Sequence, residues 1–443
     1  MAAAWTRIDK RELTALAQRL VQTPSVSGDE GAVAEAIAEA MRSAGLQVRI
    51  DAMGNVIGRM GSSGGRVLLY DGHMDTVDVG DPEQWPHPPF SGEVKRGVLY
   101  GRGAADMKGA LASMIHGAKA LNESGVALDG ELVLVAVVQE EPCEGLAIGH
   151  VIAQEGIQPD WVLIGEATNL QLSRGQRGRI TFEIDIRGRS CHASTPGLGI
   201  NAIYQASRVV MGLELLAPQL SGDSFLGQGT LAVTEIGSTA GSRNAVPERC
   251  RLYVDRRLTM GDTEAKARAE IKRVLTREGV QAEIRVPSDH TVSYSGLESE
   301  QRQVFPFWLT SEDEPVLQLA SAAIEANLGH VPRLGRWEFS TDGVYTAGVA
   351  GIPTIGFGPG EERFAHTVDE QVAIKDLVSA AKVYADLAVR LLASSSMSSS
   401  GMGPVETHHS APFAWAASDQ ERVSEPKVAA CALDGIMGGG PCW

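Results

Sequence analysis

Histidine and carboxylate residues follow several apolar runs in this sequence, where their side chains could bind a metal ion. The first place is Asp71-Gly72-His73-Met74-Asp75, directly after the apolar residues 67–70. An apolar run of this length after Gly64-Gly65 predicts a buried strand. His73 and Asp75 lie two residues apart, so both side chains point to the same side of an extended segment. This spacing suits a metal-ligating histidine oriented by a neighbouring carboxylate, although a histidine in ordinary structural hydrogen bonds fits it too.

Two further apolar runs end in acidic residues. Residues 131–138 (ELVLVAVV) are followed by Glu140 and Glu141, and residues 161–164 (WVLI) are followed by Glu166. Ligand sites in open α/β sheets lie beyond the carboxyl ends of the strands. Solvated strand ends would also place acids here, but the repetition over three runs favours one shared site.

The candidate ligands are two imidazoles and three carboxylates: His73, Asp106, Glu141, Glu166 and His366. Mixed nitrogen and oxygen ligands suit zinc, and cobalt or manganese are alternatives. One bridging carboxylate, with a histidine and an acid on each side, would hold two ions about 3.5–4 Å apart. Such a pair polarises a carbonyl and activates a water. Glu140 is then the candidate general base that passes a proton to the leaving amine.

The pattern of predicted elements divides the 443 residues into two domains and a tail. Buried-strand and amphipathic-helix patterns predict an α/β catalytic domain with a mixed sheet over residues 1–178 and 291–393. Residues 179–290 combine strands exposed on one face with two helices, which predicts an inserted α+β domain of ferredoxin-like type. Residues 394–443 are rich in glycine, serine and alanine, so we expect a disordered tail that contributes nothing to catalysis.

The composition narrows the class of partner. The formal net charge of −16 argues against nucleic acid or an anionic membrane. No stretch has the length of a membrane span, and the first residues lack the basic-then-apolar order of a signal peptide. The five cysteines are scattered without a CxxC pair, so they predict neither a disulfide framework nor a thiolate zinc site. We therefore expect a soluble, cytoplasmic protein.

Five short motifs, in order along the chain, resemble those of the M20 metallopeptidases, which include acetylornithine deacetylase, succinyl-diaminopimelate desuccinylase and glutamate carboxypeptidase. The motifs are GHMDT (72–76), GRGAADMKG (101–109), QEE (139–141), GEAT (165–168) and GPGEERFAH (358–366). Four more are similar to the branch of selenium-metabolism-linked hydrolases: RGQRGR (174–179), SCHA (190–193), DRRLT (255–259) and FSTDG (339–343). The resemblance extends over nearly the whole chain up to about residue 392.

The resemblance implies a role for each candidate ligand. Asp106 would bridge two divalent metal ions, with zinc favoured. His73 and Glu166 would bind the first ion, and Glu141 and His366 the second. The peptide bond that follows Asp106 would be cis.

The resemblance also implies roles for residues that bind no metal. Glu140 would be the general base, and Asp75 would orient the metal-ligating histidine. In the inserted lid domain, His192 and Asn244 match positions that contact the substrate's carbonyl or carboxylate. Arg257 is a weaker candidate for the substrate's carboxylate, and a structural ion pair with Asp255 is its alternative.

The same resemblance implies a homodimer formed by the inserted domains, with His192 acting in the partner's site. The alternating residues 180–186 are the candidate edge strand for this pairing, because an unpaired edge can bind its two-fold mate.

Together these features predict a two-metal amidohydrolase that cleaves an N-acyl amino acid or a similar small amide. A dipeptidase or carboxypeptidase is the alternative. A biosynthetic enzyme that forms or rearranges amides with the same site also remains open. A binding module without activity would require a broken site, whereas Glu140 and all five ligand positions are present.

Overall fold

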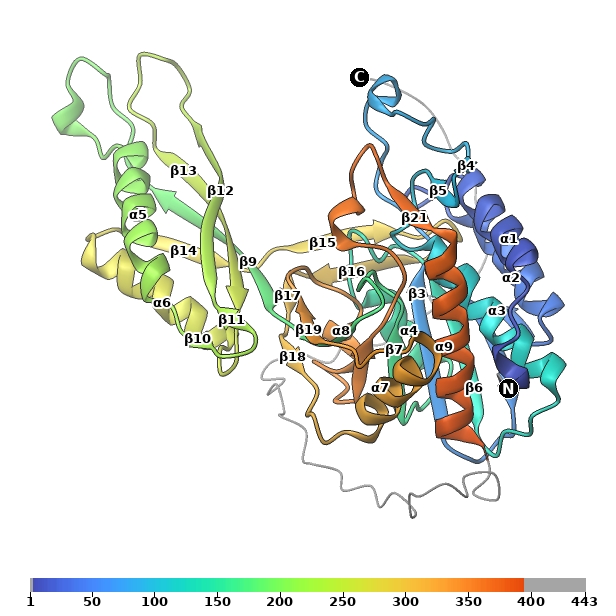
Figure 1. Ribbon diagram of the computed structural model, residues 1–443. Coiled ribbons are helices and arrows are strands. Elements are labelled where there is room, and N and C mark those ends of the chain that lie inside the picture. The colour runs from blue at the N-terminus through green and yellow to red at the C-terminus, as the bar shows by residue number, and fades with distance from the viewer. Residues whose placement is uncertain (1–2, 394–443) are drawn as a thin grey trace, which may run out of the picture.

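Two separate sheets divide the protein into a main domain and an inserted domain, which appear as two lobes in Figure 1. The computed structural model describes residues 3–393, and the predicted tail, 394–443, lies outside the described residues. No helix in this described part is long and apolar enough to cross a membrane.

The main domain is built on a nine-stranded mixed sheet. In sheet order its strands are β1 (Gln47–Ile50), β2 (Val56–Gly61), β6 (Glu131–Val137), β3 (Val67–His73), β7 (Trp161–Ile164), β20 (Thr354–Gly356), β8 (Leu172–Gln176) and β18 (Trp308–Leu309), and β19 (Leu334–Trp337) also pairs with β8. The four central strands, β6, β3, β7 and β20, are mutually parallel. Their carboxyl ends therefore lie at one edge of the sheet.

Helices cover both faces of this sheet. Strands β3 and β6 are therefore buried at nearly every position. The helices of the main domain are α1 (Lys10–Gln22), α2 (Gly31–Ser43), α3 (Lys108–Ser124), α4 (Leu146–Gln154), α7 (Pro315–Leu328), α8 (Gly343–Thr346) and α9 (Ile374–Leu392). Both α3 and α9 pack on β3 and β6, whereas α2 packs on β1 and β2. A small sheet of β4 (Val94–Lys95), β5 (Val98–Tyr100) and β21 (Gln371–Ala373) joins the loop before α3 to the segment before α9.

The inserted domain has the strand and helix order βαββαβ, which is ferredoxin-like as predicted. Its elements are β9 (Gly178–Arg187), α5 (Ala202–Leu216), β12 (Thr230–Thr239), β13 (Arg249–Leu258), α6 (Glu264–Arg277) and β14 (Ala282–Arg285). The strands form an antiparallel sheet in the order β12-β13-β9-β14. The buried side chains of β9 and β13 alternate and form a second core with α5 and α6.

The prediction that residues 180–186 form an edge strand is wrong. These residues belong to β9, which pairs with β13 on one side and with β14 and β17 (Val304–Phe305) on the other. Within the described residues, the edges of this sheet belong to β12 and β14 instead. Alternation along a strand reports that one face is buried, and it carries no information on whether the strand's two edges are paired.

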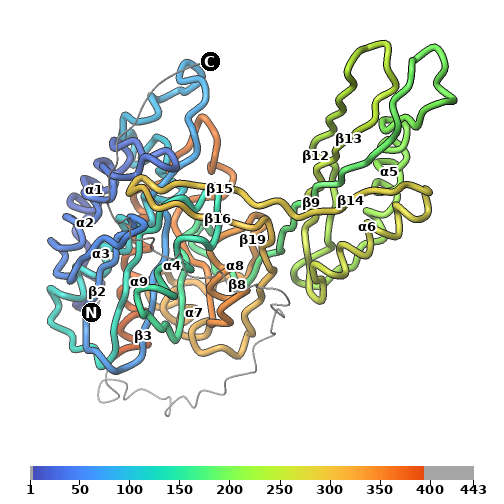
Figure 2. The backbone as a smooth tube through the Cα atoms, turned by 180° about the vertical axis from the view of Figure 1, so that it is seen from behind, coloured from blue at the N-terminus to red at the C-terminus, as the bar shows by residue number. Residues whose placement is uncertain are grey.

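A hairpin that follows the inserted domain in the chain makes contact with the main domain. Its strands are β15 (Ser288–Val292) and β16 (Glu298–Arg302), and the predicted domain boundary at residue 290 lies within β15. The hairpin leaves the inserted sheet after β14 and returns to it at β17. Figure 2 shows it reaching from the inserted lobe across to the main domain. A smaller hairpin, β10 (Gly222–Asp223) and β11 (Gly227–Gln228), lies within the inserted domain.

Candidate metal centre and active site

The strand ends bring the candidate ligands to one edge of the main sheet. His73 is the last residue of β3, and it lies beside Val137, the last residue of β6, in a parallel register. Glu140 and Glu141 follow β6, and Glu166 follows β7. The three apolar runs thus deliver their polar residues to one place, as the sequence predicted.

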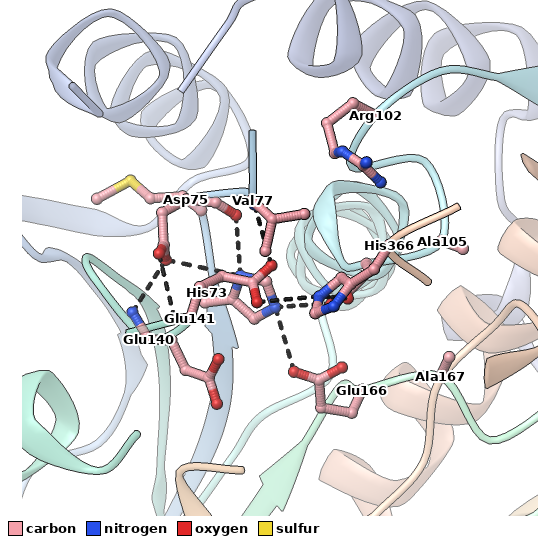
Figure 3. A network of polar contacts seen from close by, with 12 residues as sticks. His73, Asp75, Val77, Arg102, Ala105, Glu140, Glu141, Glu166, Ala167 and His366 are labelled. Carbon is pink, nitrogen blue, oxygen red and sulfur yellow. Dashed lines mark hydrogen bonds and ion pairs between the residues drawn. The ribbon is translucent and has the colours of Figure 1, made fainter. Parts of the chain in front are cut away.

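Asp106 stands between two groups of ligand atoms. Its Oδ1 lies 2.9 Å from Nε2 of His73, which is also 3.2 Å from Oε1 of Glu166. Its Oδ2 lies 3.1 Å from Nε2 of His366, which is 3.0 Å from Oε2 of Glu141. Figure 3 shows His73, Glu166 and His366 close together in this cluster.

These separations fit a pair of metal ions. In a tetrahedral site with bonds of about 2.0–2.1 Å, neighbouring ligand atoms lie roughly 3.3 Å apart. Each group offers one imidazole nitrogen, one terminal carboxylate and one oxygen of Asp106. The donor set therefore fits two divalent cations bridged by Asp106.

A buried ion pair holds the loop that carries Asp106. The Oε1 atom of Glu370 accepts hydrogen bonds from the backbone nitrogens of Ala105 (3.0 Å) and Asp106 (3.1 Å). Its Oε2 atom pairs with Arg102 at 2.5 Å. The bond between Asp106 and Met107 is cis, as the family resemblance implied. Sequence reasoning missed Glu370, although it follows His366 by four residues and shares its loop.

Asp75 acts differently from the sequence expectation. The atom nearest to Nδ1 of His73 is the main-chain carbonyl oxygen of Asp75, at 2.9 Å, whereas its carboxylate lies 3.6 Å away. The carboxylate instead accepts from the backbone nitrogens of Glu140 (3.1 Å) and Glu141 (3.2 Å), and from Oγ of Ser27 (2.6 Å). Asp75 therefore contacts both the histidine and the loop after β6. The serine was not singled out, because its loop precedes Asp75 by almost fifty residues.

Glu140 has the surroundings that a proton-transfer group needs. It is buried, and its Oε1 atom has no hydrogen-bond partner among the described residues. One of its carboxylate oxygens also lies within 4.8 Å of an imidazole nitrogen of His73 and of a carboxylate oxygen of Glu166. Burial raises the pKa of Glu140 well above that of an ordinary glutamate. The side chain is thus free of structural partners and lies beside the metal ligands.

Electrostatics in the cluster reflect an excess of carboxylates. Burial, followed by the negative charge of Asp106, raises the pKa of Glu166 to about 7. Burial acts in the same direction on Asp106, but hydrogen bonds from His366 and His73 outweigh it and hold its pKa below the usual value. The hydrogen bonds to Asp106 and Glu141 raise the pKa of His366 to about 10. Positive charge is therefore favoured between these carboxylates, which is where the donor set would hold cations.

The structure does not bring the inserted-domain candidates to this cluster. His192 is exposed in the loop between β9 and α5, where its Nδ1 lies 2.7 Å from Oγ of Ser194. Asn244 lies next to it, since its carbonyl accepts from the backbone nitrogen of Ala193. This loop and the β12–β13 turn lie at the far end of the inserted lobe (Figures 1 and 2). Arg257 pairs with Asp255 at 2.8 Å, which is the structural alternative for that residue.

Comparison with known families and proteins agrees with the fold and the motifs. The sequence pattern of peptidase family M20/M25/M40 matches residues 69–390. The chain is 38% identical over 383 residues to the uncharacterised protein YgeY of Escherichia coli (strain K12), with 86% of this chain and 95% of YgeY covered. It is 27% identical to the succinyl-diaminopimelate desuccinylase of Hydrogenovibrio crunogenus, with 86% of this chain and 99% of that protein covered.

Among solved structures, the protein has the fold of Bacillus subtilis YxeP, a dinuclear metal-binding peptidase from the M20 family. The TM-score is 0.64 with 18% sequence identity, and the match covers 86% of this chain and 98% of that chain.

Proposed function

Since the chain belongs to peptidase family M20/M25/M40 and is a metal-dependent hydrolase, we propose that it cleaves the amide bond of an N-acyl amino acid or a similar small amide with two metal ions. The observation that carries this proposal is the position of Asp106, whose two carboxylate oxygens each face a different histidine. A single-ion site would use only one of these groups.

The donor atoms support two divalent ions, of which zinc suits the mixed nitrogen and oxygen ligands best. His73, Glu166 and Asp106 would hold the first ion, and His366, Glu141 and Asp106 the second. When bound, the ions would polarise the amide carbonyl and lower the pKa of a water between them. YxeP, described as a dinuclear metal-binding peptidase, supports the same stoichiometry.

Glu140 moves the proton in this proposal. Its carboxylate accepts a proton from the attacking water and donates it to the leaving amine. Asp75 holds the backbone of Glu140 and Glu141, and thereby keeps the base beside the ligand.

Deacylation is the leading reaction, since a relative of 27% identity is named as a desuccinylase, an enzyme that removes an acyl group. A dipeptidase remains the second candidate, because the same site chemistry cleaves a peptide bond. A biosynthetic enzyme that forms or rearranges amides is the third candidate.

The oxyanion donor in this proposal is His192 from a second copy of the chain. A hydrolytic site needs a donor where the tetrahedral oxyanion forms, and His192 of the same chain contacts Ser194 in the exposed β9–α5 loop and none of the metal ligands. The exposed apolar side chains of α5, which are Ile203, Tyr204, Met211 and Leu215, and the unpaired edge of β12 support a homodimer through this domain. Asn244, which contacts the loop of His192, would then bind the substrate's carbonyl or carboxylate.

The test is turnover of a pooled library of N-acyl amino acids and dipeptides, followed by mass spectrometry, after titration of the metal-free protein with zinc. We expect two zinc ions per chain and hydrolysis of acyl amino acids. Cleavage of dipeptides alone would favour the second candidate. Saturation with zinc without any hydrolysis would contradict the proposal.

A further inference from the structure

The β15–β16 hairpin begins and ends in the inserted domain, yet its tip contacts the main domain. The turn between its strands, residues 293–297, docks beside the start of α2 and the turn between β1 and β2. Both views show the hairpin lying across the main domain (Figures 1 and 2). It is therefore an arm of the inserted domain that reaches the other domain near the candidate active site.

Tyr294 occupies a place shaped for an aromatic ring. A Cβ atom on Gly54 would lie 2.4 Å from Cε1 of Tyr294, and one on Gly31 would lie 3.2 Å from its Cδ2. The ring thus fills the space that two glycines leave open. Its hydroxyl donates to the carbonyl of Gly54 at 3.1 Å, and Oγ of Ser295 donates to the carbonyl of Ala52 at 2.8 Å. These contacts fix the tip of the hairpin on the main domain.

Gln139 joins this arm to the loop of the general base. Its side-chain Nε2 donates to the main-chain carbonyl of Val292 in β15 at 2.8 Å. Its backbone nitrogen donates to Oε1 of Glu30 at 3.1 Å, and Gly28 donates to the same oxygen at 2.9 Å. With φ of 52°, Gln139 has a backbone conformation that few residues other than glycine and asparagine adopt readily. A set of contacts around it therefore has to maintain this conformation.

The position of Gln139 makes these contacts relevant to chemistry. It immediately precedes Glu140 and Glu141, whose backbone nitrogens are held by Asp75. Asp75 thus fixes one end of the short loop 139–141, and Glu30 with Val292 fixes the other. Loss of either support would allow the carboxylate of Glu140 to move relative to the metal ligands.

We propose that the β15–β16 hairpin positions the general base, with Gln139 as the positioning residue and the carbonyl of Val292 as its partner. The inference rests on the proposed function, in which Glu140 is the base. Because the hairpin is bounded by β14 and β17, it links the inserted sheet to the loop 139–141. The inserted domain thereby acts on its own chain's site as well as on the partner's.

Two substitutions at Gln139 test the contact. Gln139→Ala removes the amide, whereas Gln139→Asn keeps an amide and the left-handed backbone but is one methylene too short to reach Val292. We expect both to lower kcat by about 10- to 100-fold, the range for a misplaced catalytic group, with KM and metal content nearly unchanged. Hydrogen exchange of the amides of residues 139–141 should accelerate about fivefold or more, since one hydrogen bond is lost.

Tyr294→Ala tests the hairpin itself, and His290→Ala on the same hairpin is its control, because that side chain is 62% exposed. We expect Tyr294→Ala to reproduce the loss of kcat and the faster exchange, and His290→Ala to leave both unchanged. In the Tyr294→Ala background, Gln139→Ala should lower kcat little further. The effects of two substitutions do not add when both act through the same set of contacts.

Unchanged exchange in both Gln139 variants would overturn the inference, as would faster exchange with full kcat. Full additivity of Gln139→Ala and Tyr294→Ala would also overturn it. The exchange measurement needs no substrate, so it decides whether the hairpin holds the loop even if the proposed function fails in the substrate screen.

Discussion

At the scale of single residues, the candidate site depends on which atom of each residue makes a given contact. Asp106 presents one oxygen to each histidine, and Asp75 uses its carbonyl for His73 and its carboxylate for the loop after β6. Glu140 and its neighbour Glu141 have different environments although both follow β6. An oxygen of Glu140 has no hydrogen-bond partner among residues 3–393, whereas an oxygen of Glu141 lies 3.0 Å from Nε2 of His366. Two predictions follow from these assignments.

Substitution of Asp106 should affect both metal ions. The variant Asp106→Asn keeps the size of the side chain but loses the charge that two ions share, so we expect fewer than two zinc ions per chain by elemental analysis. The exposed Asp81 offers a control, and Asp81→Asn should retain the wild-type metal content. Two tightly bound ions in the Asp106→Asn protein would exclude the bridging role.

Substitution of Glu140 should separate catalysis from metal binding. We expect Glu140→Ala to lower kcat by about 10²–10⁴-fold, the typical contribution of a general base, with its metal content intact. The neighbouring Glu141→Ala should lose metal as well as activity, because Glu141 is assigned as a ligand. If the two variants behave in the opposite way, the roles of the two glutamates are exchanged.

At the scale of elements, the ends of strands and helices determine where the polar groups lie. The parallel strands β6, β3 and β7 end side by side, and this alone collects His73, the Glu140–Glu141 pair and Glu166. The start of α2 contributes Glu30, which is buried and accepts from Gly28 and Gln139. A buried acid at such a position makes the stability of the protein depend on pH.

Ionisation of Glu30 should lower the free energy of unfolding as the pH rises. Burial, aided by the nearby charge of Asp75, raises its pKa from 4.5 to about 7 in the folded protein. The folded state then binds more protons than the unfolded state between these values, so the stabilising contribution is present below pH 4.5 and is lost as the pH rises through 7. Between pH 5 and 8 the free energy of unfolding of the wild type should fall, relative to Glu30→Gln, by up to about 3 kcal/mol.

Urea unfolding of both proteins at pH 5 and pH 8 measures this difference. The comparison with Glu30→Gln also controls for packing, because glutamine has nearly the same shape as glutamate and cannot ionise. A difference between the two proteins that stays constant with pH would contradict the assignment.

At the scale of the whole molecule, the two domains have different parts in the proposed site. The main domain supplies every candidate ligand, whereas His192 belongs to the β9–α5 loop of the inserted domain. The inserted domain presents an unpaired β12 edge and exposed apolar residues on α5, so a second copy of the chain is the partner that we propose.

Mixing two inactive proteins tests this arrangement. If His192 acts in the partner's site, a heterodimer of His192→Ala and Glu140→Ala chains contains one site with both groups intact. Random exchange of subunits should then restore about a quarter of the wild-type activity. No recovery, with subunit exchange shown independently by mass spectrometry, would mean that His192 does not act across a dimer interface.

Sequence alone determined the features that depend on local pattern. The apolar runs before His73, Glu140 and Glu166 predicted buried strands, and the four central strands were found parallel with these residues at one edge. Strand β7 has the bounds of the apolar run 161–164, because polar or turn-forming residues flank this run on both sides. The family motifs added the ligand set, whose members the structure brings together around Asp106.

Only the tertiary structure decided which groups meet across long stretches of chain. Alternation could not reveal that β9 is an interior strand, since it records one buried face and leaves the edges undetermined. Likewise, the sequence carries no local sign that Val292 reaches Gln139 or that Glu370 holds the Asp106 loop. These contacts depend on how separate elements pack against each other, and no periodic pattern within one element records that packing.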